Sequence, residues 1–186
     1  MSKIKIGVKK FYYAAQTAED TASTAATYGS PKAIEGLRTV GIEVDQETNT
    51  LYADDGPFAT DVGAPTIKVS IELAEIPLED QAALLGHTYD STNKTLTSKT
   101  SDSPPYVAIM FAGTTSDGGN LGVKLFKGKF SEPNDNYQTK EENIEWQPQT
   151  IEGEFVALKN NSTYKYVQEF ASGASMDTFF SAVLPS

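Results

Sequence analysis

The segment Thr66-Ile-Lys-Val-Ser-Ile-Glu-Leu73 (TIKVSIEL) carries the strongest fold signal in the sequence. Its aliphatic side chains recur at every second position, with Lys68, Ser70 and Glu72 between them. A period of two places alternate side chains on opposite faces of a β-strand. The pattern predicts a strand over Thr66–Ala74 with one buried and one polar face, as in antiparallel or mixed sheets.

Other segments repeat this alternation or replace it with continuous hydrophobicity. Lys3–Val8, the residues Val40, Ile42 and Val44, and Ile151–Ala157 alternate. Tyr106–Ala112 (YVAIMFA) is apolar throughout, which indicates a central strand buried on both faces. A turn, Thr115–Asn120 (TSDGGN), joins it to Leu121–Phe130 (LGVKLFKGKF), so this pair is expected to form a hairpin.

Three consecutive aromatic residues, Phe11, Tyr12 and Tyr13, must point to both faces of a strand. Either the strand is buried on both faces, or it offers one face to a partner. Trp146, in a segment expected to be a loop, either packs that loop down or anchors an interface.

Helix signals are few. Leu78–Leu85 follows Pro77, has acidic residues in its first turn and ends at Gly86, with Leu78, Ala82 and Leu85 on one face. A second short helix is expected after Ser175, where apolar residues repeat at i, i+3, i+4 and i+7: Met176, Phe179, Phe180 and Val183. Three long segments are expected to be loops: Ala15–Ser30, Asp90–Pro105 and Ser131–Gln149.

These elements predict one mainly β domain over residues 1–186. We expect an antiparallel or mixed β-sandwich with one or two helices packed against its sheets.

Composition excludes several classes of site. The net charge of −10 with no basic block argues against wrapping nucleic acid. The absence of cysteine excludes disulfides, thiolate metal sites and cysteine nucleophiles. No window resembles a membrane span or the apolar core of a signal peptide, so we expect synthesis and folding in a reducing cytoplasm.

The acidic motif Asp54-Asp55-Gly56, within Leu51–Pro57 (LYADDGP), does not fit a calcium loop. Such a loop needs carboxylates at alternating positions and a glutamate at its twelfth position. Here the two acids are adjacent and the next is Asp61. We expect a turn or an interface loop, without a metal or cofactor.

No other motif provides a catalytic set. His87 is the only histidine, follows the predicted helix end and has no nucleophile-elbow sequence nearby. Gly118-Gly119 lacks the Lys and Ser/Thr of a phosphate-binding loop. The charged cluster Thr139–Glu145 (TKEENIE) is expected to be a solvated or interface edge. A non-enzymatic binding or assembly protein is therefore favoured.

Several segments, in this order, resemble the major tail proteins (tail-tube proteins) of long-tailed phages of Gram-positive bacteria. The resemblance covers about residues 5–158 and rests on the order and spacing of the following segments: Lys5–Ala14, Tyr28–Gly36, Leu51–Asp55, Ile67–Leu73, Leu84–Gly86, Pro105–Ile109, Leu125–Phe130, Thr139–Glu142 and Gln149–Leu158.

The resemblance implies a structural virion protein with the tail-tube fold: two antiparallel or mixed β-sheets packed as a sandwich or open barrel, with one flanking α-helix. It also implies a long loop at about residues 52–65 and a C-terminal extension at about 159–186, which matches the family less clearly. In that family six copies form a ring, and stacked rings form the hollow tail tube through which DNA passes into the host. Partners would be further copies, the tape measure protein and the tail-tip and terminator proteins, with DNA passing transiently and with no membrane partner. The resemblance also implies that the 52–65 loop contacts the next subunit or ring, through these residues: Tyr52, Asp54, Asp55, Gly56, Pro57, Phe58 and Asp61.

Two alternatives remain open. A carbohydrate- or protein-binding β-sandwich module, such as a virion decoration or adhesion protein, would need a platform of solvent-facing aromatics, for example Tyr12, Tyr89 and Trp146. An acidic hydrolase would need Asp54 and Asp55 to act with Glu141 or Glu142.

Overall fold

A computed structural model describes residues 3–133, 139 and 147–185. The described part contains thirteen strands and two short helices. Their bounds are β1 (Lys5–Ala18), β2 (Thr27–Tyr28), β3 (Lys32–Ile34), β4 (Leu37–Asp45), β5 (Thr48–Ala53), β6 (Gly56–Val62), β7 (Thr66–Leu73), α1 (Leu78–Leu85), β8 (Thr88–Asp90), β9 (Thr95–Thr97), β10 (Val107–Thr115), β11 (Asn120–Phe130), β12 (Gln149–Val156), β13 (Lys165–Phe170) and α2 (Asp177–Ser181).

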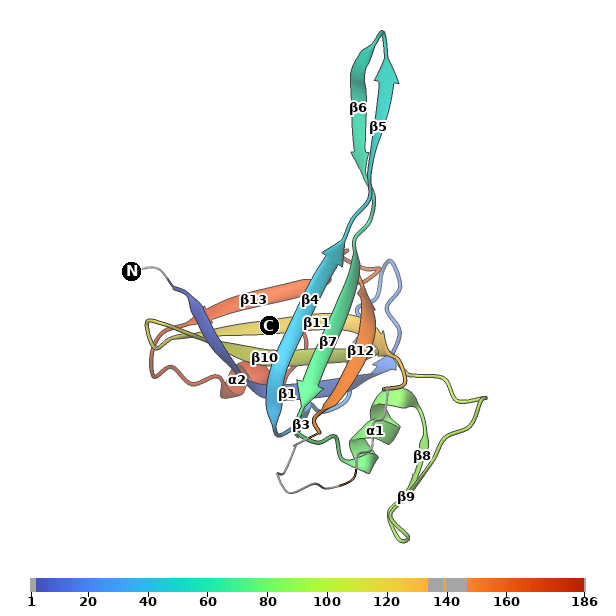
Figure 1. Cartoon of the computed structure of the whole chain (residues 1–186), viewed down its shortest axis with the longest axis vertical. Helices are drawn as coiled ribbons and strands as arrows, with labels where there is room; N and C mark the ends of the chain where they lie inside the picture. Colours follow the sequence, from blue (N-terminus) through green and yellow to red (C-terminus); the bar gives the residue numbers. More distant parts are fainter. Residues whose placement is uncertain (1–2, 134–138, 140–146, 186) are drawn as a thin grey trace.

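Nine strands form one antiparallel sheet in the order β2-β1-β10-β11-β12-β7-β4, with β13 also paired to β11 and β3 to β1. The sheet divides at β11, because Asn120–Leu125 pairs with β13 whereas Lys127–Phe130 pairs with β12. Figure 1 shows β4, β7 and β12 crossing steeply in front of β10, β11 and β13. The predicted antiparallel, mainly β fold is confirmed, but one sheet folded over on itself replaces two separate sheets.

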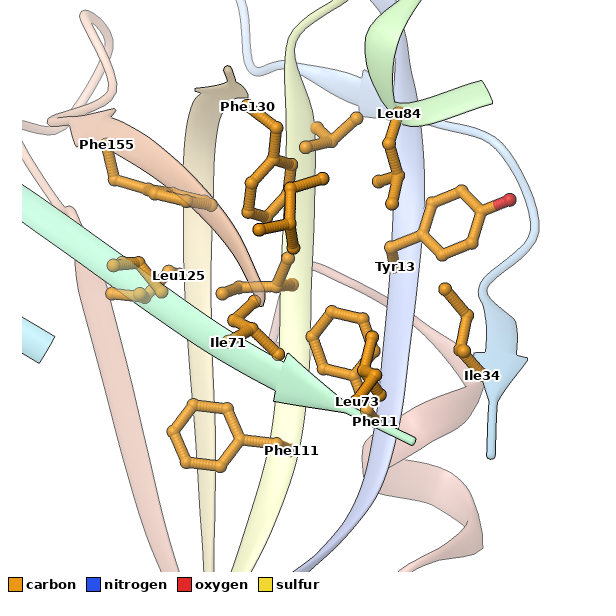
Figure 2. Packing of buried hydrophobic residues seen from close by; sticks show 14 of the residues in the cluster. Phe11, Tyr13, Ile34, Ile71, Leu73, Leu84, Phe111, Leu125, Phe130 and Phe155 are labelled. Carbon is orange, nitrogen blue, oxygen red and sulfur yellow. The ribbon is translucent and has the colours of Figure 1, made fainter. Parts of the chain in front are cut away.

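The first core lies between the two halves of this folded sheet. From β7 it takes Ile67, Val69, Ile71 and Leu73, as their alternation predicted. Figure 2 shows Ile71 and Leu73 of β7 directed toward aromatic and aliphatic side chains from the other half, including Phe11, Phe111 and Leu125. The register places Ile71 opposite Ile151 of β12 on one side and Val40 of β4 on the other.

β10 separates this core from a second one. Val107, Ile109 and Phe111 belong to the first core, whereas Ala108, Met110 and Ala112 belong to the second. The predicted central strand and its hairpin with β11 are therefore confirmed. β1 behaves in the same way around its aromatic triplet, because Phe11 and Tyr13 enter the first core while Tyr12 packs against the second.

The helix α1 begins and ends where the sequence predicts. Gly86 has φ +78°, and a Cβ there would lie 2.4 Å from the Ser103 carbonyl oxygen, so the position requires glycine. The expected buried face is partly wrong, since Leu78 is exposed and Leu84 is buried instead. Asp80 is also buried, where its Oδ1 accepts a hydrogen bond from the Tyr13 hydroxyl at 2.8 Å and lies 2.8 Å from Lys32 Nζ.

The C-terminal residues cover the second core. The four predicted helix positions, Met176, Phe179, Phe180 and Val183, are all buried there, although α2 itself spans only Asp177–Ser181. Two expected loops contain strands: Ala15–Ser30 includes the end of β1 and β2, and Asp90–Pro105 includes the end of β8 and β9. Most of the third, Ser131–Gln149, lies outside the described residues.

Candidate assembly surface

The segment expected to be a long loop at about 52–65 is instead mostly a two-stranded hairpin. β5 and β6 pair from Thr48↔Val62 to Ala53↔Gly56. Asp54 and Asp55 connect them with φ of 50° and 61°. Two central residues with positive φ define the type I′ turn that matches the twist of a hairpin. The adjacent aspartates thus form a turn, as predicted from their mismatch with the calcium-loop pattern.

The hairpin extends the β4–β7 pair beyond the end of the large sheet (Figure 1). Two hydrogen bonds close its base: Gln46 Nε2 donates to the Gly63 carbonyl, and Gly63 N–H donates to the Glu47 carbonyl, both at 2.9 Å. Because these bonds follow the end of β4 and precede β7, the chain leaves and re-enters the sheet at one point.

All seven residues predicted for the interface lie on this hairpin, and every one except Gly56 is exposed. Tyr52 and Phe58 keep 71% and 72% of their surface in solvent. Leu51 and Val62 on the same hairpin are also exposed, although they are not among the seven predicted interface residues. Large apolar residues rarely gather on a projecting element unless it contacts a partner.

The large sheet also has strand edges without a neighbour in the described part. β4 pairs only with β7, and β13 pairs only with β11. Between Lys5 and Lys9, β1 pairs only with β10. Unpaired backbone N–H and C=O groups on such edges can accept a strand from another chain.

The outward face of β4, β7 and β12 is predominantly acidic. The register aligns Glu43, Lys68 and Glu154 in one row across the three strands, and places Glu152 opposite Ser70 in the next. These residues line a shallow, open depression of about 500 Å³. Within the described ranges no group of histidine and acidic residues could hold a metal ion.

His87 lies in an ionic link outside the hairpin, in which its own side chain is buried and that of Glu132 is exposed. Its Nδ1 is 3.0 Å from Asp102 Oδ2, and its Nε2 is 2.6 Å from Glu132 Oε1. The hydrogen bond with Asp102 raises the pKa of His87 above its ordinary value, against the opposing effect of burial, and Glu132 adds to the increase. The same bond lowers the pKa of Asp102. The link joins the end of α1 to the segments before β10 and after β11.

Among the described residues, those weighed for other functions lie on different elements. The Tyr12 ring stacks on Phe180 with centroids 4.6 Å apart, so it contributes to packing. Tyr89 is half-buried in β8, and Trp146 lies outside the described residues. Asp54 and Asp55 are exposed at the hairpin turn, and the charged cluster from Lys140 to Glu145, which includes Glu141 and Glu142, lies outside the described residues.

Helices in the described ranges are all too short to cross a membrane. No protein-family model matches the chain, and the curated proteins include no match to it either.

Proposed function

We propose that this chain is a major tail-tube subunit of a long-tailed bacteriophage. Copies assemble into hexameric rings, and the rings stack into the hollow tube through which phage DNA passes into the host. The protein is then synthesised and assembled in the host cytoplasm and resides in the virion tail. The proposal combines the sequence resemblance with the site geometry, and it implies no catalytic activity and no cofactor.

The observation that carries the proposal is the projecting β5–β6 hairpin. It leaves the sheet through a closed base and exposes Leu51, Tyr52 and Phe58, which contribute nothing to either core. Because these residues lie outside both cores, the hairpin adds little to the folding stability of its own subunit. Contact with a neighbouring subunit would explain why the chain carries it. The edges of β4 and β13 that have no partner within the described residues support the proposal, because strand pairing around a ring would satisfy them.

The acidic face of β4, β7 and β12 is consistent with a conduit for a polyanion. A surface that carries Glu43, Glu152 and Glu154 repels phosphate groups, so DNA moving along it would not be retained. Further partners under this proposal are the tape measure protein and the tail-tip and terminator proteins. The alternative of a ligand-binding β-sandwich module remains a proposal without a specific structural observation in its favour.

The decisive experiment is negative-stain electron microscopy of the purified protein over a concentration series, with the mass in solution measured in parallel. The proposal predicts sixfold rings or hollow tubes, alone or after addition of the tail-tip complex. A monodisperse monomer that forms neither, and that binds glycans on an array, would instead support the binding module.

A further inference from the structure

Two exposed surfaces of the chain carry apolar residues together with charges of opposite sign. The arm surface, on the β5–β6 hairpin, consists of Leu51, Tyr52, Asp54, Asp55, Phe58 and Asp61. The strand surface, on and just before the start of β1, consists of Lys3, Ile4, Lys5, Ile6, Lys9 and Lys10. None of these residues belongs to either core, although the Lys10 side chain contacts a core residue of its own subunit, because its Nζ lies 5.7 Å from the centroid of the Phe180 ring.

The strand surface combines four lysines with two exposed isoleucines, and Asp117 and Glu169 lie beside Lys3 and Lys5 in one depression. Ile4 and Ile6 are 61% and 68% exposed, although their alternation with lysine is typical of a strand with a buried face. Among the described residues no acidic side chain lies within ion-pair distance of Lys5 or Lys9, whereas Lys3 pairs with Glu169. Within the part of the chain that the structure describes, the edge of β1 from Lys5 to Lys9 also lacks a second neighbouring strand.

The arm surface has the complementary character. Thr48–Val62 contains three aspartates and no lysine or arginine. Two of these aspartates form the turn, so their charges lie at the end farthest from the sheet, beside the exposed Tyr52 and Phe58. Opposite charges around apolar centres favour association and fix its register.

A single chain does not bring these surfaces together. The hairpin extends from one end of β4 and β7, whereas the start of β1 lies at the other side of the sheet, near the β10–β11 turn (Figure 1). Each copy therefore offers one donor surface and one acceptor surface. Such a head-to-tail contact repeats from copy to copy and produces a ring or a filament.

We propose that the arm surface of one copy docks on the strand surface of a second copy. The aspartates of the hairpin face the lysines of β1, and Tyr52 and Phe58 cover Ile4 and Ile6. This inference deepens the proposed function, on which it rests for the identity of the assembly, by naming the two surfaces that meet.

Charge reversal tests the contact in both directions. The variant K3E/K5E/K9E changes the four lysines of the strand surface from +4 to −2, and D54K/D55K/D61K changes the arm surface from −3 to +3. Lysine is compatible with the turn, because Lys10 and Lys94 already adopt φ of 55° and 54°. Circular dichroism and thermal unfolding check that each variant retains its fold.

Each reversal alone places like charges together, so the dissociation constant measured by sedimentation velocity should rise at least tenfold. The chain that carries all six substitutions should recover association, and so should an equimolar mixture of the two variants. Association of the unmodified chain should weaken as salt is raised. Failure of the six-fold variant and of the mixture to recover would overturn the proposal, as would an unmodified chain that stays monomeric at millimolar concentration.

The test separates this contact from the proposed function. Hollow tubes that form equally well with either reversed variant would leave the tail-tube function standing and overturn the contact. Charge-dependent association that never yields rings or tubes, even with the tail-tip complex, would support the contact and remove the tail-tube function.

Discussion

Gly128 of β11 and Phe155 of β12 face each other across the sheet, and the ring of Phe155 occupies the space that a side chain at Gly128 would need. A Cβ at Gly128 would lie 2.4 Å from Phe155 Cγ. Two residues along, the relationship is reversed, because Phe130 of β11 covers Gly153 of β12. The two rings meet edge to face at 5.8 Å. These pairs connect the halves of the folded sheet, and so they hold the hairpin-bearing half in place.

Gly128→Ala should destabilise the protein by about 1–3 kcal/mol, because the new methyl group must displace a fully packed ring or the strand. The free energy of unfolding in urea measures the loss. Gly41→Ala is the matched control: it lies in strand β4, its Cβ would meet only ordinary contacts at 3.8 Å or more, and its effect should stay within about 0.5 kcal/mol. Equal stability of both variants would contradict this account of the β11–β12 junction.

The sequence predicts an element correctly where the pattern that determines it lies within one short segment. The alternation in β7, the apolar run in β10 and the helix ending at Gly86 are local patterns, and each was found correctly. The sequence does not predict the strands of the β5–β6 hairpin. Hydrophobic alternation indicates a strand with one buried face, and neither β5 nor β6 has a buried face. Its turn alone, Asp54-Asp55 before glycine, was a usable signal.

Which residues are buried, and which distant residues pair, is harder to predict from the sequence. The alternation of Ile4 and Ile6 predicts a strand but cannot tell that its apolar face stays in solvent. Nothing in the sequence suggests that Asp20 and Lys127, which are 107 positions apart, form a buried ion pair. The hairpin residues of the candidate assembly surface are a prediction from the resemblance, whereas the strand surface of β1 becomes visible only in the fold.

The buried pair of Asp20 and Lys127 should be essential for stability. Their atoms Oδ1 and Nζ are 2.6 Å apart, both side chains are buried, and the Lys159 N–H also donates to Asp20. Lys127→Met should cost about 3–5 kcal/mol, because it leaves the Asp20 carboxylate buried without its partner. The double variant D20A/K127M should lose less than the sum of the single losses. Urea unfolding of the three variants measures both effects.

The exposed ion pair of Arg38 and Glu72 provides the control, since Arg38→Gln should cost at most about 1 kcal/mol. Burial alone would raise the pKa of Asp20, but its hydrogen bonds to Lys127 and Lys159 outweigh burial and lower it. The contribution of the pair to the free energy of unfolding is therefore present at pH values above the ordinary aspartate pKa. It is lost as pH falls through the lowered pKa of Asp20. A stability loss that is the same for Lys127→Met and Arg38→Gln would contradict the role of the buried pair.

The His87 link should give stability a second pH dependence of opposite sign. Because the fold raises the pKa of His87 above 6.5, the link contributes fully below that pH and is lost as pH rises through the raised value. His87→Gln should therefore destabilise the protein more at pH 5.5 than at pH 9. As the only histidine, His87 gives a single Hε1 ring resonance, and an NMR titration that places its pKa at or below 6.5 would contradict this prediction.

Tyr52 and Phe58 should contribute to assembly and not to folding. Both are exposed on the hairpin, so Y52S/F58S should change the free energy of unfolding by less than about 0.5 kcal/mol. Aromatic residues at the centre of an interface commonly contribute about 2 kcal/mol or more each, so the loss of even one should raise the dissociation constant about thirtyfold, and the double variant should show at least that increase. The matched control T50S/T60S alters a directly paired, exposed couple on the same hairpin and should assemble normally. If Y52S/F58S forms rings and tubes at the same concentration as this control, the hairpin is not an assembly element, and the observation that carries the tail-tube proposal is lost.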